Sequence, residues 1–168
     1  MVNPIEPPDS HQLLAAQGWA ELGDYQEAEA ALMEIAPKLR AHPQVLAVRY
    51  EIYARSKRWD QAAEVATRLV DGFAHHVGAW VSLAYAVRRK TDGGLTKARD
   101  ILTRARTLFP KESLIAYNLA CYECQMGNQP AALEWLRQAI TLGGKREIKK
   151  VALKDEDLQP LWERIGGL

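Results

Sequence analysis

The sequence predicts an all-α fold made of four helix-turn-helix pairs and a C-terminal capping helix. Three observations lead to this prediction. Small residues recur along the chain at intervals of about 34 residues. Within each interval, apolar residues follow the i, i+3, i+4, i+7 spacing of amphipathic helices rather than the alternation of strands. Turn-forming residues then divide each interval into two helical halves.

The repeat is clearest in four alanines that stand 34, 36 and 34 residues apart, namely Ala28, Ala62, Ala98 and Ala132. The same spacing relates Leu32, Ala66, Leu102 and Leu136, and an upstream set, Ala16, Tyr50, Ala84 and Ala120, is spaced by 34, 34 and 36 residues. A period of this length is the signature of a helical repeat array. We therefore expect four units near residues 10–42, 43–76, 77–111 and 112–144, followed by a cap at 145–168.

Each unit is expected to hold two helices. In chain order they are predicted near residues 10–22, 25–40, 44–56, 59–73, 77–90, 95–109, 112–126 and 130–142. The turns inside the units are predicted at Gly23-Asp24, Ser56-Lys57-Arg58, Asp92-Gly93-Gly94 and Gly127-Asn128. Asp9-Ser10 is predicted to cap the first helix, and Pro130 suits a first helical turn because its missing amide hydrogen costs nothing there.

The C-terminal cap begins with a basic segment, residues 145–150, for which a short helix or turn is predicted. An apolar stripe follows, made of Leu158, Leu161, Trp162 and Ile165. Asp157 is predicted to cap this last helix, and Pro160 to lie in its first turn. A stack of helix pairs exposes an apolar end, so we expect this helix to cover the final pair.

The composition predicts a single soluble domain over residues 1–168, with 48% hydrophobic and 26% charged residues. A formal net charge of +1 gives no field that would require nucleic acid or an anionic membrane surface as a partner. The chain is nevertheless uneven, acidic before Lys38 and basic in its middle. No stretch is apolar enough for a membrane span, the N-terminus lacks a secretory signal, and two cysteines are too few for a disulfide framework. A cytoplasmic location is therefore expected.

The sequence contains no recognisable catalytic, metal or cofactor motif. Cys121 and Cys124 have no second Cys or His pair at the spacing of a structural zinc site. Four histidines, His11, His42, His75 and His76, are expected at helix ends or in connections, where no nucleophile and base come together. The glycine pairs do not open into a phosphate-binding loop. We therefore expect no metal, no cofactor and no enzyme activity.

The residues at the repeated positions resemble the tetratricopeptide repeat (TPR) over about residues 10–144. The fourth unit is the closest match, with Tyr117-Asn118-Leu119-Ala120, then Gly127, Ala132, Leu136 and Ala139. The other units contribute Gly23-Asp24-Tyr25 and Ala28, Tyr53, Trp59 and Ala62, and Trp80, Leu83, Ala84, Ala98, Ala105 and Pro110. Arg49, Tyr50 and an insertion near Asp92 depart from the pattern. The resemblance implies a right-handed superhelix with a concave groove.

In that family, the first helix of each pair lines the groove that binds a peptide or a protein segment. Transferring those positions predicts a binding surface made of Gln17, Glu51, Arg55, Tyr85, Arg88, Arg89, Tyr117 and Asn118. Arginine and tyrosine at its centre favour an acidic or carboxylate-ended partner. The predicted function is a non-catalytic protein-interaction scaffold.

Two alternatives remain open at this point. The acidic first end and the basic middle would also suit a self-associating structural subunit, a homo-oligomer in which one copy docks on another. A small dedicated chaperone for a secreted protein is the other, since some such chaperones are short arrays of this repeat. An adaptor for a chaperone tail is not expected, because Leu13 stands where the family's first clamp lysine would lie and only Asn118 matches the clamp in type.

Overall fold

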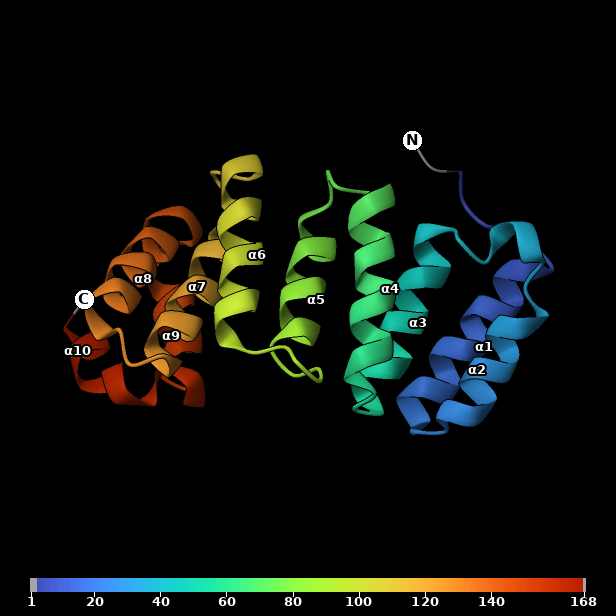
Figure 1. Ribbon diagram of the computed structural model, residues 1–168, viewed down its shortest axis with the longest axis horizontal. Helices are drawn as coiled ribbons and strands as arrows, with labels where there is room; N and C mark the ends of the chain where they lie inside the picture. The colour runs from blue at the N-terminus through green and yellow to red at the C-terminus, as the bar shows by residue number, and fades with distance from the viewer. Residues whose placement is uncertain (1–2, 168) are drawn as a thin grey trace. The chain divides into compact units, whose positions relative to one another are not determined.

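The computed structural model describes residues 3–167, and helices joined by short connections make up this part of the chain (Figure 1). None of the described residues lies in a strand, so the predicted all-α class is confirmed. The described residues divide into two compact units, with the boundary between Thr91 and Asp92. We refer to them as unit 1 and unit 2 and describe each by itself.

Unit 1 contains the first two helix pairs and the first helix of the third. Its elements are α1 (Asp9–Leu22), α2 (Tyr25–Glu34), the 3₁₀ turn η1 (Pro37–Leu39), α3 (Pro43–Arg55), α4 (Trp59–Gly72) and α5 (Val77–Val87). Helices adjacent in sequence pack together, α1 on α2, α3 on α4 and α4 on α5. In addition, α1 packs on α3, which places the first helices of two successive pairs side by side.

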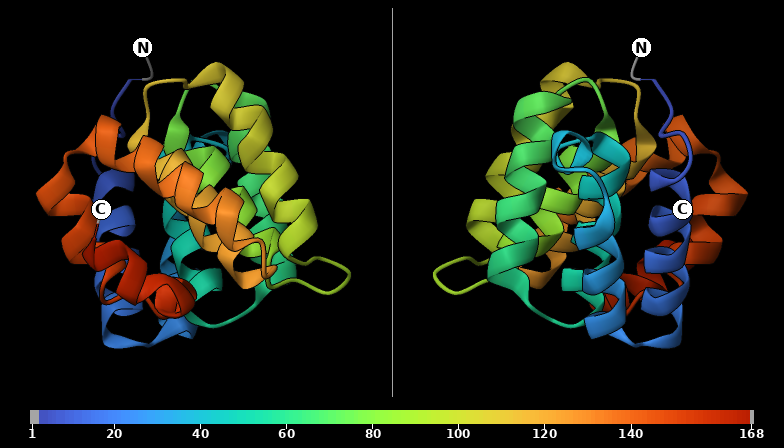
Figure 2. Two further views of the ribbon diagram at one scale, coloured as in Figure 1. Left: turned by 90° about the vertical axis from the view of Figure 1, so that its left-hand side faces the viewer. Right: turned by 90° about the vertical axis from the view of Figure 1, so that its right-hand side faces the viewer.

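Unit 2 contains the remaining helices. They are α6 (Leu95–Leu108), α7 (Ser113–Gln125), α8 (Gln129–Gly143), α9 (Lys145–Ala152), the 3₁₀ helix η2 (Glu156–Leu161) and α10 (Trp162–Gly166). The contact between α7 and α8 is extensive. The chain then turns back, so that η2 packs on α7 while α10 contacts α9 and η2; Figure 2 shows this last segment in red.

The repeated alanines lie in the buried contacts between helices. Ala28, Ala62, Ala98 and Ala132 are all fully buried, and so are their partners one turn later, Leu32, Ala66, Leu102 and Leu136. A methyl group allows two helix backbones to come close, and any larger side chain would hold them apart. The period read from the sequence is therefore the period of the close helix contacts.

Tyr50 is the exception in the series that it shares with Ala16, Ala84 and Ala120. The three alanines are completely buried, whereas Tyr50 is partly exposed. A phenol ring cannot occupy a site built for a methyl group, so part of the ring lies outside the close contact. Tyr50 also lines the open groove between α3 and α5 that is described below.

Two predicted helix ends were wrong. The second helix ends at Glu34 instead of continuing to residue 40, because Ala36 precedes Pro37 and a residue before proline favours extended backbone. The Arg40 side chain then binds the freed carbonyls of Met33 and Ile35, at 2.6 and 2.9 Å. The fifth helix ends at Val87 instead of residue 90, where Arg89 N donates to Ala86 O and the backbone tightens into a turn.

The predicted caps at the two ends of the chain also need correction. Asp9 lies inside α1, and its carboxylate accepts a hydrogen bond from Ala36 N at 2.6 Å, which ties α1 to the end of α2. At the C-terminus the capping side chain is that of Asp155, which accepts from Asp157 N at 3.0 Å. Pro160 lies within the 3₁₀ helix, where it supplies no backbone donor, and the α-helix begins only at Trp162.

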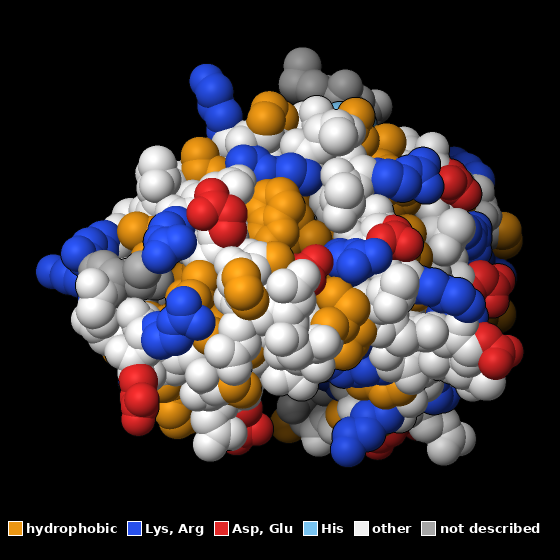
Figure 3. Space-filling model, turned by 60° about the vertical axis from the view of Figure 1, so that its left-hand side comes forward, with side chains coloured by type: hydrophobic (Ala, Val, Ile, Leu, Met, Phe, Trp, Pro, Cys, Tyr) orange, Lys and Arg blue, Asp and Glu red, His pale blue; other side chains and the backbone are white. Residues whose placement is uncertain are grey.

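The surface carries charges of both signs. On the face drawn in Figure 3, Lys and Arg side chains are interspersed with Asp and Glu and with apolar side chains. Among the described residues, no helix combines the length and the apolar character needed to cross a membrane.

The packing at the repeated alanines yields a stability prediction. Ala98→Trp should lower the free energy of unfolding by about 1–3 kcal/mol, because the larger side chain overfills a fully buried contact on α6. The matched control is Thr103→Trp, since Thr103 lies exposed on the same helix. Urea unfolding followed by circular dichroism measures both. Equal stabilities of the two variants would show that Ala98 does not lie at a close helix contact.

Candidate peptide-binding groove

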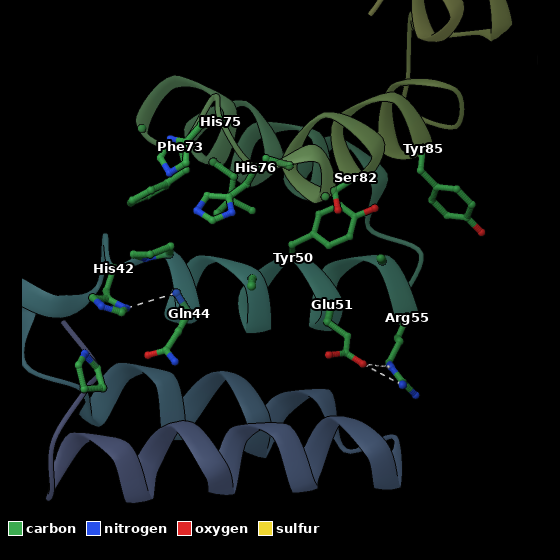
Figure 4. Close-up of a pocket in the computed structure, with 18 of the residues that line it drawn as sticks. His42, Gln44, Tyr50, Glu51, Arg55, Phe73, His75, His76, Ser82 and Tyr85 are labelled. Atoms are coloured by element: carbon green, nitrogen blue, oxygen red, sulfur yellow. Dashed lines mark hydrogen bonds and ion pairs between the residues drawn. The ribbon is translucent and has the colours of Figure 1, made fainter. Parts of the chain in front are cut away.

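Unit 1 contains an open groove with a volume of about 1230 Å³ between α3 and α5 (Figure 4). Its α3 side is lined by His42, Gln44, Ala47, Tyr50, Glu51, Ala54 and Arg55, and its other side by Phe73, His75, His76, Gly78, Ala79, Ser82 and Tyr85. A smaller hollow of about 420 Å³ lies between α1 and α3. Gln44, Ala47 and Glu51 line both, so the two hollows adjoin along α3.

The middle of the groove is lined mainly by apolar side chains. The helix spacing brings Ala47, Ala54 and Ala79 to its walls, and these short side chains leave the space open. Tyr50 forms part of the wall between them, and its hydroxyl hydrogen-bonds the Ser82 side chain. Burial raises the pKa of Tyr50, so the phenol keeps its proton to a higher pH than an exposed tyrosine does.

One end of the groove carries three imidazoles. His42 Nδ1 accepts a hydrogen bond from Gln44 N at 3.3 Å, and its Nε2 donates to Asn3 O at 2.8 Å. This pair of bonds requires the neutral ring with the proton on Nε2. His75 and His76 lie together, with ring centroids 4.3 Å apart. The two bonds of His42 join the N-terminal segment to the start of α3 at this end of the groove.

The other end is charged and aromatic. Arg55 pairs with Glu51 one turn earlier on α3, with Nη2 and Oε1 2.8 Å apart. Arg89 lies over the Tyr85 ring, 3.6 Å from its centroid, and 5.4 Å from the centroid of Trp59. Trp59 meets Tyr85 edge to face at 5.8 Å. Stacking on two aromatic rings restricts the Arg89 guanidinium before any ligand arrives.

The corresponding face of unit 2 is covered by the chain's own C-terminal segment. Tyr117 OH on α7 donates to Asp155 Oδ2 at 2.8 Å, and Cys121 Sγ lies 3.6 Å from the same oxygen. One turn further on, Gln125 Nε2 donates to Asp157 O at 3.0 Å. Burial, reinforced by the Asp155 carboxylate, raises the pKa of Tyr117, which keeps the phenol protonated as the donor in this contact.

Buried apolar side chains also hold the segment in place. Leu158, Leu161 and Ile165 are completely buried. Trp162 Nε1 donates to Ala152 O at 3.0 Å, which fixes the start of α10 to the end of α9. The predicted covering of the last helix pair is therefore present, and it reaches the face of α7.

The structure places the predicted binding residues in three groups. Gln17 lines the smaller hollow; Glu51, Arg55 and Tyr85 line the groove, with Arg88 and Arg89 just beyond the end of α5. Tyr117 and Asn118 belong to unit 2, where Tyr117 bonds Asp155 and Asn118 Nδ2 donates to Leu114 O at 2.8 Å.

Sequence reasoning overlooked Tyr50 and the three histidines as lining residues. The signal for Tyr50 was present, since a tyrosine stands there in a series otherwise made of alanine. The histidines were predicted to lie at helix ends and in connections. His11 lies in the first turn of α1, and His42, His75 and His76 lie in connections that border the groove.

Asp155 and Asp157 lie near Cys121 in a cluster of potential metal ligands that the sequence did not predict. One ligand atom each of Cys121, Asp155 and Asp157 lies within 4.8 Å of the others. Hydrogen bonds from Tyr117, Cys121 and the Asp157 amide already engage the Asp155 carboxylate. These contacts account for the cluster as part of the attachment of the C-terminal segment.

Comparison with known proteins identifies the fold. No protein-family model and no curated protein sequence matches the chain. Among solved structures, TTC0263 of Thermus thermophilus, a thermophilic TPR protein, has a TM-score of 0.70 at 18% identity over 94% of this chain and 83% of that one. MamA of Desulfovibrio magneticus RS-1 has a TM-score of 0.67 at 21% identity over 80% and 75%. Another MamA structure reaches 0.67 at 19% identity over 95% and 86%. The predicted tetratricopeptide-type fold is confirmed.

The bond between Tyr117 and Asp155 predicts a pH effect. Because the folded-state pKa of Tyr117 is raised above its unfolded value, the unfolded chain loses this proton first as the pH rises above about 10. Alkaline pH should therefore lower the free energy of unfolding of the native protein. Tyr117→Phe should not show the part of this decrease that comes from Tyr117. At neutral pH the free energy of unfolding of the same variant should be about 1–2 kcal/mol lower than that of the native protein, because the hydrogen bond is missing.

Urea unfolding of both proteins at about pH 8 and about pH 10.5 tests this, because these values lie on either side of the ordinary tyrosine pKa. The stability difference between the native protein and Tyr117→Phe should shrink at the higher pH. Other tyrosines, Tyr50 included, titrate equally in both proteins and cancel. A difference that stays constant across the two conditions would contradict the assignment.

Proposed function

We propose that this chain is a non-catalytic interaction scaffold that binds a segment of a partner protein in the groove of unit 1. One observation carries the proposal. The α3 and α5 faces border an open groove of about 1230 Å³, whereas the equivalent α7 face of unit 2 is already occupied by Asp155, Leu158 and Leu161. The groove thus leaves the α3 and α5 faces with space for a ligand.

The walls suit a peptide better than a flat protein surface. Ala47, Ala54 and Ala79 leave space for the partner's side chains, and burying apolar side chains against them supplies the binding free energy. The Ser82 and Tyr50 hydroxyls and Gln44 add polar groups in and beside this apolar strip, which can pair with the partner's backbone. Such a combination favours an extended or helical segment.

The charged end favours a partner that is acidic or ends in a carboxylate. Arg55 is the last residue of α3, Arg88 and Arg89 follow the end of α5, and the Arg89 guanidinium lies over the Tyr85 ring. Arg55 is already paired with Glu51, so a ligand carboxylate would have to share that guanidinium. Arginine forks and tyrosine rings are the groups that dominate binding energy at protein interfaces.

Binding without catalysis is the function we propose for this groove. A nucleophilic serine needs a base within hydrogen-bond reach. The Ser82 side chain instead hydrogen-bonds Tyr50, a phenol that keeps its proton. His42, at the far end, is engaged on both ring nitrogens.

The test fills the groove without disturbing the core. Ala47 is exposed and lines both hollows, so Ala47→Trp should occupy the groove while leaving the fold intact. A peptide library displayed on phage is selected on the native full-length chain, and the selected peptides are then measured on the variant. We expect their affinity to fall at least about tenfold, the loss typical of a central contact.

The matched control is Gln61→Trp, because Gln61 is exposed on α4 and does not line the groove. It should bind the selected peptides as the native chain does. Circular dichroism verifies that both variants remain helical. Peptides that bind Ala47→Trp undiminished would place the binding surface elsewhere on the chain.

A further inference from the structure

A mixed cluster of sulfur and oxygen atoms lies where the C-terminal segment meets α7. Cys121 and Cys124 stand three residues apart on that helix, and Asp155 and Asp157 stand two residues apart in the segment. One ligand atom each of Cys121, Asp155 and Asp157 lies within 4.8 Å of the others. Two short motifs, Cys-x-x-Cys and Asp-x-Asp, are thereby brought together from distant parts of the chain.

The spacing of these atoms suits a metal ion that takes both sulfur and oxygen ligands. Cys121 Sγ lies 3.6 Å from Asp155 Oδ2. Zinc bonds of about 2.3 Å to sulfur and about 2.0 Å to oxygen, at the tetrahedral angle, place the two ligand atoms about 3.5 Å apart. Asp157 has a carboxylate oxygen within 4.8 Å of both atoms, so a small rotation of its side chain completes a third bond. A closed tetrahedral site needs one more ligand.

Cys124 supplies that fourth ligand. Its side chain is 5% exposed, and no hydrogen bond engages its thiol within residues 3–167. Burial raises the pKa of Cys124, and the charges of Asp157 and Asp155 raise it further, so both carboxylates act on this thiol. Ligands at i and i+3 project from the same face of a helix, as they do in the metal sites of helical bundles. Cys124 is therefore a buried sulfur that adjoins the two aspartates and has no other polar role.

The two aspartates are already oriented as metal ligands usually are. Asp155 Oδ2 accepts from Tyr117 OH at 2.8 Å, and Asp155 Oδ1 accepts from Asp157 N at 3.0 Å. Gln125 Nε2 donates to Asp157 O at 3.0 Å, which fixes the backbone of the second aspartate. Outer hydrogen bonds of this kind orient ligating carboxylates and strengthen metal binding. The contacts that attach the C-terminal segment thus also hold its carboxylates for a metal ion.

The mixture of ligands selects the metal. Thiolates favour zinc and copper(I), whereas carboxylates favour magnesium, calcium and manganese. Zinc accepts both kinds of ligand in a tetrahedral site. A search of the sequence for a second Cys or His pair misses this site, because its other two ligands are aspartates that only the fold brings to α7.

We propose that unit 2 holds a structural zinc ion whose four ligands are Cys121, Cys124, Asp155 and Asp157. Binding replaces the proton of each thiol by a zinc–sulfur bond, and both protons pass to solvent. The ion fastens the C-terminal segment to α7. Its role is structural because protein atoms fill all four positions and leave none for a substrate. The zinc site is independent of the groove of unit 1 and of the function proposed for it.

Cobalt(II) is the probe, because it takes the place of zinc in tetrahedral sites and absorbs in the near ultraviolet when thiolates bind it. The full-length chain, kept reduced and freed of metal with a chelating resin, is titrated with cobalt(II) at neutral pH. We expect thiolate-to-cobalt absorption that saturates at about one cobalt per chain and disappears when zinc is added. Imidazoles give no such band, so binding at His75 and His76 would not imitate it. A native chain without the band would overturn the proposal.

Three variants and a control assign the ligands. Cys121→Ser and Asp155→Asn should each weaken cobalt binding at least about a hundredfold, and Tyr117→Phe, which removes only an orienting hydrogen bond, about tenfold. The matched control is Glu156→Gln, because Glu156 is an exposed carboxylate between the two aspartates. It should change the affinity less than about threefold. Equal weakening by Asp155→Asn and Glu156→Gln would place the cobalt on the acidic surface of the segment and overturn the proposal.

Urea unfolding followed by circular dichroism tests whether the ion fastens the segment. A ligand that binds the folded chain raises its stability by mass action, so excess zinc should raise the urea midpoint of the native chain. The midpoint of Cys121→Ser should not respond. Each protein is compared with itself, with and without zinc, so the test holds even where a substitution loosens the segment. An equal response of the two proteins, or no response of the native chain, would overturn the proposal.

Discussion

The close approach of helix backbones at the repeated alanines is the constraint on which the rest of the structure depends. Each alanine is fully buried, so a helix in every pair is held at a distance that only a methyl group allows. In unit 1, α3 and α5 both pack on α4, which carries Ala62 and Ala66, and this packing holds α3 and α5 on the two sides of the groove. The groove therefore results from the packing of the helices.

The fold could be predicted from the sequence because it depends on a repeat of about 34 residues, which can be measured along the chain. Helix type, the four pairs and the covering C-terminal segment all rest on spacing that any reader of the chain can measure. Helix ends were predicted less well. The end of α2 follows from the extended backbone before Pro37, and the cap at Asp155 depends on the path of the segment back to α7. Neither a single proline nor a contact with a distant residue is part of the period.

The candidate site could be predicted only in part, for the same reason. Gln17, Glu51, Arg55 and Tyr85 stand at periodic positions, and each lines a hollow of unit 1. Tyr117 stands at a periodic position too, yet its hydroxyl is taken by Asp155, 38 residues later in the chain. Periodicity identifies which face a residue occupies. It does not reveal whether another part of the chain already lies on that face.

Tyr50 gives the groove a property that a perfect repeat would lack. Identical units would offer a ligand several equivalent binding positions, each one repeat apart, and a bound segment could shift from one to the next. A phenol in a series otherwise made of alanine removes that degeneracy, because one position now differs in shape and in hydrogen-bonding capacity from the others. A segment bound in the proposed groove would meet this difference at one position, which would favour a single register.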